Sequence, residues 1–312
     1  KLTRFLELLK KNKYAVQKNI FNGWILVNKP AGITSADVVR VLKKKMNPTK
    51  IGHAGTLDPD ATGLIPIALG EATKAIPYLL RSKKKYEASF LYGLKTDTDD
   101  SSGITLKTSY YIPRKNEILE AFKYYSEVLF QIPPKVSAVK IKGKRAYKRF
   151  KAKETFQLTA RRIKVYKLSL QSYDKKGESL VHFECSKGGY VRSIARDIGD
   201  FLGCFGHVRN LKRIEYGPFK ADKATDLSDL LELSIENLIS NIMDIEIGIP
   251  GLKIFECNSD DVRHLKNGRP IECPVAFDFG EGEELIAKHK GKVAGILFRE
   301  AGFLKVKRKF NT

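Results

Sequence analysis

Apolar residues along this chain recur with two periods, one typical of helices and one typical of strands. A period near that of the α-helix predicts helices over 35–45, 72–80, 116–125, 191–202 and 227–242. Alternating or short apolar runs between turn residues predict strands over 23–27, 64–69, 86–94, 163–172 and 179–185. Because these helices and strands do not alternate as in a doubly wound parallel sheet, the pattern predicts an α+β fold.

The two ends of the chain have patterns of their own. Within residues 1–21, apolar side chains at helical spacing among lysines predict a short amphipathic helix. An Ile-Pro-Gly segment at 249–251 marks a change in composition, and the residues after it predict a short helix and several strands. We therefore expect a large domain over 22–247 and a small β-barrel over 248–312.

The charge of the chain indicates its partner. It carries 57 Lys and Arg residues against 35 Asp and Glu, a net charge of +22 with a pI near 9.7. Such a balance favours a polyanion. Residues 140–167 hold twelve basic residues and one acid, Glu154, with aromatic residues between them. This pattern is typical of phosphate contacts beside stacking surfaces, and a solvated basic face is the alternative.

Metal, disulfide and membrane classes are not favoured. The four cysteines and five histidines are scattered, without the spacing of a disulfide framework or a zinc site, so no metal is expected. No apolar run approaches the roughly 20 residues that span a bilayer. Charged residues interrupt the first apolar positions before the core of a signal peptide could form. We therefore expect a cytoplasmic protein without membrane contact.

The segment with the most chemical interest is 51–63, Ile-Gly-His-Ala-Gly-Thr-Leu-Asp-Pro-Asp-Ala-Thr-Gly. Its glycines permit positive φ angles, and Pro59 stiffens the backbone after Asp58, so a carboxylate stands on a rigid and uncrowded loop. Four interpretations fit the residues alone. They are metal ligation by His53, Asp58 and Asp60, a phosphate cradle, nucleophilic catalysis by a carboxylate, and a tight turn with a capping aspartate.

This segment is similar to the signature loop of the bacterial tRNA pseudouridine-55 synthases, the TruB-type pseudouridine synthase family. The similarity continues in order over residues 23–219, about two-thirds of the chain. The other matching segments are Asn28–Ser35, Gly70–Lys74, Lys85–Asp99, Pro133–Tyr147, Lys187–Arg192 and Gly206–Leu211. The C-terminal residues resemble, more loosely, the PUA RNA-binding fold.

The resemblance implies a fold and a set of catalytic residues. The fold is a mixed, largely antiparallel central sheet flanked by helices, followed by a PUA-like β-barrel. Asp58 is implied to be the catalytic carboxylate, which either attacks the ribose C1′ or abstracts a ribose proton. Arg192 is implied to keep Asp58 ionised and oriented. Tyr86 is implied to stack on the flipped uracil and to relay a proton.

Further residues are implied to bind the substrate. His53, Tyr190 and Leu211 would line the pocket with Tyr86. The basic residues implied to contact RNA, from the upstream motif and the segment 133–167, are Lys29, Lys140, Lys144, Arg145, Lys148 and Arg149. Asp60 stands where an apolar residue is usual in this family, so its role stays open.

The implied activity is the cofactor-free isomerisation of uridine to pseudouridine at position 55 in the T loop of tRNA. The implied partner is the T stem-loop, bound by a monomer that needs no guide RNA. A guide-RNA-dependent synthase, an RNA chaperone without catalysis and a ribosome-associated structural protein are the alternatives. The intact set of Asp58, Tyr86 and Arg192 disfavours a chaperone without catalysis. In each case we expect affinity for RNA to fall steeply with salt.

Overall fold

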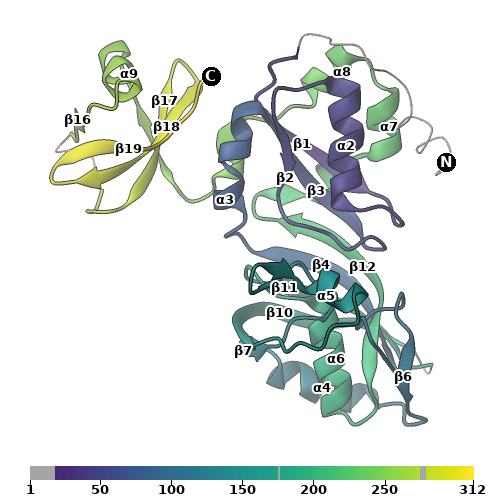
Figure 1. Ribbon diagram of the computed structural model, residues 1–312. Coiled ribbons are helices and arrows are strands. Elements are labelled where there is room, and N and C mark those ends of the chain that lie inside the picture. Colours follow the sequence, from purple (N-terminus) through teal and green to yellow (C-terminus); the bar gives the residue numbers. More distant parts are fainter. Residues whose placement is uncertain (1–17, 175, 275–278) are drawn as a thin grey trace.

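The computed structural model describes residues 18–174, 176–274 and 279–312. The helix expected within residues 1–21 lies outside the described residues, apart from 18–21, which form no helix. Two parts follow one another along the chain, a large domain built on one long sheet and a smaller C-terminal sheet beside it (Figure 1). In the described part of the chain, no helix is long and apolar enough to cross a membrane.

The large domain is built on a mixed, largely antiparallel sheet of ten strands, as the resemblance implied. Its main path runs β14-β1-β3-β12-β4-β11-β10-β7, with β2 beside β3 and β13 beside β12. The described pairings in this sheet are antiparallel except β1 with β14 and β12 with β3. Its strands are β1 (Gly23–Lys29), β2 (Ile51–His53), β3 (Thr62–Leu69), β4 (Lys84–Tyr92), β7 (Glu127–Gln131), β10 (Arg161–Tyr173), β11 (Glu178–Cys185), β12 (Gly206–Tyr216), β13 (Phe219–Lys220) and β14 (Thr225–Asp226).

Strands β1 and β3 are buried on both faces, which explains their continuous apolar sequences. Ile25 and Val27 belong to the main core under the helices, whereas Trp24 and Leu26 belong to a second core on the opposite face. The helices of this domain are α2 (Ser35–Met46), α3 (Ile76–Leu79), α4 (Lys115–Tyr124), α5 (Ala146–Lys151), α6 (Val191–Phe201), α7 (Leu227–Glu232) and α8 (Ile235–Ser240). Helices α2, α7 and α8 cover the β1 end of the sheet, and α4 and α6 the other end (Figure 1).

Two of the expected long helices are broken. The helix expected over 72–80 is a 3₁₀ turn, η1 (Gly70–Lys74), followed by α3, with Pro77 in the first turn of α3. Proline has no N–H to donate and disfavours helical backbone at the preceding residue, so the two turns do not fuse. The helix expected over 227–242 is interrupted at Leu233, which is extended, and Ser234 caps α8 by accepting a bond from Asn237 N.

The C-terminal part is a curled, PUA-like sheet of five strands in the order β15-β17-β18-β19-β16. Its elements are β15 (Lys253–Glu256), α9 (Ser259–Lys266), β16 (Ile271–Glu272), β17 (Glu284–His289), β18 (Lys292–Glu300) and β19 (Phe303–Lys309). Ile286 and Ile296 pack in one core with Trp24 of β1. The Lys288 ammonium lies 2.6 Å from Glu246 Oε1 across the same contact. This sheet is therefore packed against the large domain as well as linked to it.

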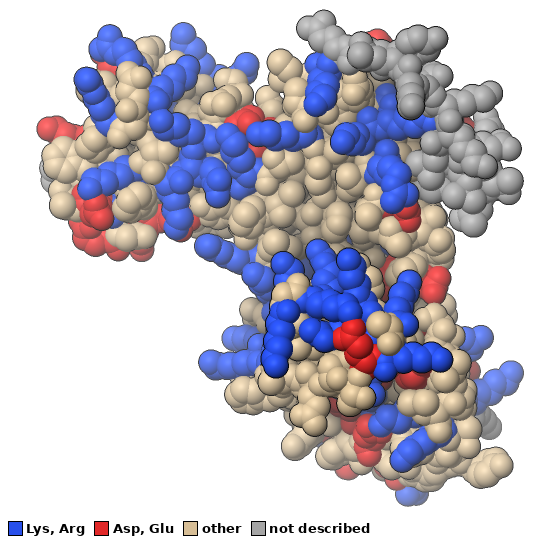
Figure 2. Space-filling view, in the orientation of Figure 1, with Lys and Arg blue, Asp and Glu red and all other residues tan. Residues whose placement is uncertain are grey.

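Two small hairpins project from the large domain. One pairs β5 (Leu94–Thr96) with β6 (Thr105–Thr108), and the loop between them is rich in Asp and Ser residues. The other pairs β8 (Lys140–Ile141) with β9 (Lys144–Arg145) and leads into α5. Lys and Arg side chains gather over this second hairpin and α5, and again over the C-terminal sheet (Figure 2).

Candidate active site

Asp58 lies in the loop that joins β2 to β3, and buried residues on both sides hold this loop in place. Leu57 and Ala61 are buried next to it, in the main core. Leu57 N donates to Ser35 Oγ at 2.9 Å, and Ser35 Oγ donates back to Leu57 O at 3.2 Å, so the start of α2 is bonded to the loop. The Asp58 side chain itself is 37% exposed. The loop thus anchors its backbone and leaves the Asp58 side chain partly exposed.

Lys29 supports the same loop from beneath. Its side chain is fully buried, and its ammonium donates to the carbonyl oxygens of Pro30, Ile33 and Pro59 at 2.8, 2.8 and 2.7 Å. Burial lowers the pKa of Lys29 to about 8, against the raising effect of Asp60 and Asp58. Because an ammonium has three donors and all three are used here, Lys29 braces the loop and offers no donor to RNA. Its position differs from the RNA contact implied for it.

Arg192 meets Asp58 from the first turn of α6. Its Nη2 donates to Asp58 Oδ1 at 3.0 Å, and its Nε lies 2.9 Å from Oδ2, so both carboxylate oxygens face the guanidinium. Arg192 is 3% exposed, and it also donates to Thr98 O at 2.8 Å and to Val136 O at 2.9 Å. The guanidinium is therefore held by neighbours on two other segments before it meets the carboxylate. This geometry is typical of strong, oriented arginine–carboxylate pairs.

The ionisation of Asp58 depends on two opposing effects. Burial raises the pKa of Asp58 above its usual value, the Arg192 guanidinium opposes that rise, and the Asp100 carboxylate adds to it. The net direction is upward. Arg192 therefore favours the ionised form of a carboxyl group that its surroundings would otherwise protonate more readily.

The loop between β5 and β6 completes this charge network, and its acids were not among the site residues expected from the sequence. Asp100 Oδ2 lies 3.4 Å from Arg192 Nη1. The adjacent Asp99, which has φ of 60°, lies 2.8 Å from Arg196 Nη1, one turn further along α6. Two acids of this loop thus face two arginines of one helix. The run of alternating Thr and Asp residues in this loop was the available signal.

The pocket residues implied by the resemblance lie on four different segments, with His53 at the end of β2. Tyr86 and Leu211 lie on neighbouring strands, β4 and β12, and Leu211 pairs with Ala88, two residues beyond Tyr86 on the same face. Tyr190 precedes α6, two residues before Arg192, and its backbone N–H and carbonyl are both bonded to the Gln131 amide. Tyr190 therefore lies close to Arg192 along the chain, and Leu211 lies near Tyr86 on the adjacent strand.

Burial shifts the pKa values of Tyr86 and His53 in the directions that favour their neutral forms. Burial raises the pKa of the Tyr86 phenol, and Arg213 opposes that rise. Burial lowers the pKa of His53, and the Arg213 guanidinium lowers it further. Arg213 was absent from the residues expected from the sequence. The feature that could have identified Arg213 is its position two residues after Leu211 on the same strand, where it is a charged residue at a buried position.

The basic residues of the segment 133–167 divide into two groups. Lys140, Arg145 and Lys148 are exposed. Lys144 and Arg149 both bond to Glu154, the acid that interrupts the basic run, and Arg149 Nη1 lies 2.6 Å from it. Glu154 therefore joins the β8–β9 hairpin to α5. This interaction orients the basic segment and neutralises part of its positive charge.

The metal interpretation of the loop has no geometric support. Among the described residues, no three His, Cys, Asp or Glu side chains gather as a metal site requires. Asp60 is exposed, two residues beyond Asp58.

Solved structures of other proteins share this architecture. The chain matches a structure titled "Crystal Structure of a Cbf5-Nop10-Gar1 Complex" with a TM-score of 0.71 at 23% identity, over 93% of this chain and 85% of that one. It matches "Structure of H/ACA RNP bound to a substrate RNA containing 2'-deoxyuridine" with a TM-score of 0.69 at 21% identity, over 93% and 85%. These similarities concern the fold.

Sequence comparisons identify the family. The model of the TruB family pseudouridylate synthase N-terminal domain matches residues 43–191, and that of the tRNA pseudouridylate synthase B C-terminal domain matches residues 192–245. A tRNA pseudouridine synthase B of Ruegeria sp. (strain TM1040) is 40% identical over 93% of this chain and 96% of its own length. One from Roseobacter denitrificans is 42% identical over 83% and 86%. The chain belongs to the TruB family of pseudouridylate synthases.

Proposed function

We propose that this protein isomerises uridine to pseudouridine at position 55 in the T loop of tRNA, without a guide RNA and without a cofactor. The observation that carries this proposal is the pair formed by Asp58, which lies on a braced loop and is 37% exposed, and the buried Arg192 of α6. The names of the relatives, which are tRNA pseudouridine synthases, support the choice of substrate.

Asp58 would act on the ribose of the target nucleotide. The reaction breaks the bond from C1′ to N1, forms a bond from C1′ to C5, releases the C5 proton and returns a proton to N1. No electron acceptor or energy source is needed, so a positioned carboxylate can serve as nucleophile or base. Both routes require the ionised carboxylate, which the Arg192 guanidinium favours and orients.

The base must leave its stack before it can rotate, and this extrusion costs a few kcal/mol. Tyr86 would stack on the extruded uracil and take part in the transfer of the C5 proton. Tyr190 and Leu211 would line the sides of the pocket. His53 would face RNA as a neutral imidazole, since its pKa is lowered by burial and by Arg213. Aromatic surfaces of this kind supply part of the energy of extrusion by stacking.

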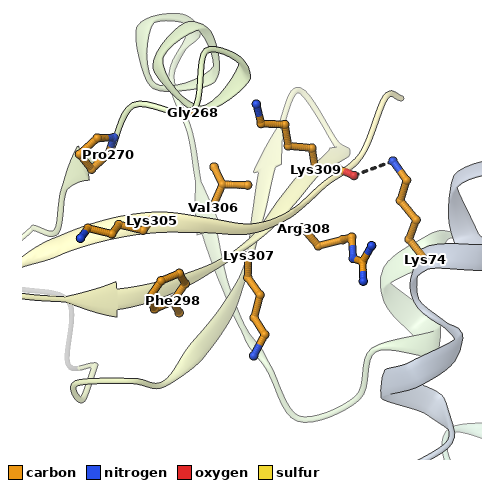
Figure 3. Close-up of a pocket in the computed structure, with 9 residues that line it drawn as sticks. All are labelled: Lys74, Gly268, Pro270, Phe298, Lys305, Val306, Lys307, Arg308 and Lys309. Carbon is orange, nitrogen blue, oxygen red and sulfur yellow. Dashed lines mark hydrogen bonds between the residues drawn. The ribbon is translucent and has the colours of Figure 1, made fainter.

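The RNA would follow two basic surfaces. The first is the β8–β9 hairpin with α5, where Lys140, Arg145 and Lys148 are exposed. The second is on the C-terminal sheet, where basic residues surround a hollow of about 650 Å³ (Figure 3). Phe298 and Pro270 supply its apolar wall. The basic residues that line it are Lys74, Lys305, Lys307, Arg308 and Lys309. None of the residues that line this hollow is acidic.

The decisive experiment compares the parent protein with Asp58→Asn on a transcribed tRNA, with pseudouridine detected by chemical tagging. The variant keeps the size of the side chain and removes its charge, so we expect at least about a 10³-fold loss of single-turnover rate. We expect the affinity for tRNA to remain within about threefold. Asp60→Asn is the matched control, because Asp60 is exposed and undergoes the same change two residues away. An Asp58→Asn protein that forms pseudouridine at the parental rate would overturn the proposal.

A second measurement separates this activity from a guide-RNA-dependent synthase. The purified protein is incubated with an isolated T-arm transcript and no other component. Tagging at the T-loop uridine supports stand-alone activity on tRNA. Absence of tagging on this transcript and on full-length tRNA, with tagging after addition of a guide RNA, would support the rival enzyme.

A further inference from the structure

Arg213 is a buried cation at the centre of the main sheet. It lies on β12, and its side chain is among the largest that are fully buried, with 1% exposed. It pairs with Gly63 on β3 and with Tyr86 on β4, so it lies between the strand that follows the catalytic loop and the strand that carries the pocket tyrosine. None of the ion pairs among the described residues includes Arg213. Arg213 is therefore a buried cation without a carboxylate partner in the described part of the chain.

An unpaired buried charge is unfavourable, because the loss of hydration costs several kcal/mol unless other groups replace it. Here the replacements are backbone carbonyls and one ring. Arg213 Nε donates to Leu64 O at 2.8 Å, Nη2 donates to Gly55 O at 3.2 Å, and the guanidinium carbon lies 4.9 Å from the centre of the Tyr216 ring. These groups compensate the charge in part, and an apolar side chain of similar length would avoid the cost.

The two carbonyl acceptors lie at opposite ends of the catalytic loop. Gly55 stands three residues before Asp58, and Leu64 lies in β3, after the loop has returned to the sheet. Gly55 has φ of +79°, and a Cβ there would lie 3.1 Å from the Tyr216 ring, so its carbonyl is confined by the same ring that faces Arg213. One side chain therefore spans the loop that presents the catalytic carboxylate.

Arg213 also places a positive charge behind two pocket side chains. It opposes the rise that burial causes in the pKa of Tyr86, and it adds to the fall in the pKa of His53. A fixed positive charge beside a buried phenol favours the phenolate, the form that can accept a proton. The same charge keeps the imidazole neutral.

We propose that Arg213 is a positioning residue of the isomerisation. It fixes both ends of the loop that carries Asp58, and it holds a positive charge behind Tyr86. Its contribution is therefore to the rate of the chemical step and not to the affinity for tRNA. This inference rests on the proposed function, and it adds a residue that contacts neither the ribose nor the base.

The test uses Arg213→Lys and Arg213→Met in the full-length protein. We expect Arg213→Met to lower the single-turnover rate on a T-arm transcript by about 10²-fold, since small displacements of a catalytic group have effects of that size. The dissociation constant of the transcript should stay within about threefold. Arg213→Lys keeps the charge with fewer directed donors, so its single-turnover rate should be at least about tenfold higher than that of Arg213→Met. A Met variant with parental rate, or equal losses in both variants, would overturn the proposal.

Arg209→Met is the matched control, because Arg209 lies on the same strand in an exposed ion pair with Glu178. It should retain the parental rate. Circular dichroism and thermal unfolding show whether Arg213→Met folds. If it does not, Arg213→Lys is measured instead in two backgrounds, the parent protein and the Tyr86→Phe variant. Loss of rate on introducing Lys should be smaller in the Phe background, since Lys moves the charge away from a phenol that is absent there. If Arg213→Lys lowered the rate by the same factor in both backgrounds, the proposed effect of Arg213 on Tyr86 would be overturned.

These outcomes are distinct from a failure of the proposed function itself. A parent protein that forms no pseudouridine in tRNA would remove the proposed function, whatever the Arg213 variants do. A parent that is active and an Arg213→Met protein that is equally active would remove only the present inference.

Discussion

Three buried cations surround the loop that carries Asp58, and each satisfies its donors differently. Arg192 pairs with the Asp58 carboxylate, Lys29 donates to three carbonyls, and Arg213 donates to two carbonyls and faces a ring. Only the first of these pairs with Asp58. Carbonyl oxygens do not neutralise a cation, so Lys29 and Arg213 keep their positive charge beneath the loop.

The pH dependence of the reaction follows from the direction of the Asp58 shift. Catalysis needs the ionised carboxylate, so the rate falls as pH decreases through the pKa of Asp58, which burial raises above its usual value. Removing Arg192 removes the main effect that lowers this pKa. We therefore expect Arg192→Gln to reduce the rate. The pH at which the rate falls on the acid side of the pH–rate profile, its acid limb, should rise by about one pH unit or more. Single-turnover rates of both proteins measured across acid and neutral pH test this.

Arg209→Gln is the control for that experiment, because it removes an exposed arginine of the same protein and should leave the acid limb in place. An acid limb at the same pH in the parent and in Arg192→Gln would contradict the assignment of the limb to Asp58.

At the level of elements, β12 assembles the site. It is a long strand that the helical and strand periods did not predict, because polar and charged residues occupy much of it. It pairs in parallel with β3 and antiparallel with β4, and so brings Leu211 and Arg213 between the catalytic loop and Tyr86. The close approach of β12 to β3 requires Gly63, which has φ of +96° and would place a Cβ 2.4 Å from Arg213 O.

Gly63→Ala should therefore destabilise the protein. The positive φ and the backbone clash each cost about 1 to 3 kcal/mol, so we expect the free energy of unfolding to fall by about 2 to 6 kcal/mol. Urea denaturation followed by circular dichroism measures this. Gly188→Ala is the matched control, since Gly188 has φ of +91° and nothing within 4 Å of an added Cβ. A Gly63→Ala protein no less stable than Gly188→Ala would contradict the clash.

At the level of the whole molecule, the two basic surfaces lie on different parts of the chain. The β8–β9 hairpin and α5 belong to the large domain, whereas the hollow of Figure 3 lies on the C-terminal sheet, with Lys74 as its one lining residue from the large domain. Lys74 also donates to Lys309 O at 2.7 Å, so this surface crosses the boundary between the two parts. A substrate longer than the T arm is expected to use both surfaces.

The C-terminal surface can be tested separately from the active site. Replacing Arg308 and Lys309 by Gln removes two positive charges that would face phosphates. The slope of the logarithm of tRNA affinity against the logarithm of salt concentration should then become shallower by about 0.7 to 0.9 for each phosphate no longer neutralised. We expect weaker binding of full-length tRNA and unchanged binding of the isolated T arm. Fluorescence anisotropy with both RNAs between low and physiological salt measures this.

The control removes two exposed lysines of α4, Lys115 and Lys123, in the same way. This double variant has the same net charge and should bind tRNA nearly as the parent does. Equal weakening of tRNA binding by the two double variants would show that net charge, and not the hollow, determines the affinity.

Local information was enough for several features of this protein. The strands β1, β3, β10 and β11 and the helices α2, α4 and α6 follow directly from the apolar pattern, because each buries a face that its own residues specify. The rigid loop with Asp58 and Pro59, and the basic run beside Glu154, are likewise contiguous in the chain. The sequence by itself therefore determined the α+β class, the loop that carries Asp58 and a partner of opposite charge.

Only the tertiary structure decided how distant side chains meet. Arg192 comes from 134 residues away to pair with Asp58, Lys29 turns inward to brace the loop, and Arg213 becomes a buried neighbour of Tyr86. The pairing of β12 with both β3 and β4 produces the last of these contacts. Apolar periodicity states which face of a strand is buried but not which strand lies beside it, so the electrostatic surroundings of the catalytic acid appear only when the sheet is assembled.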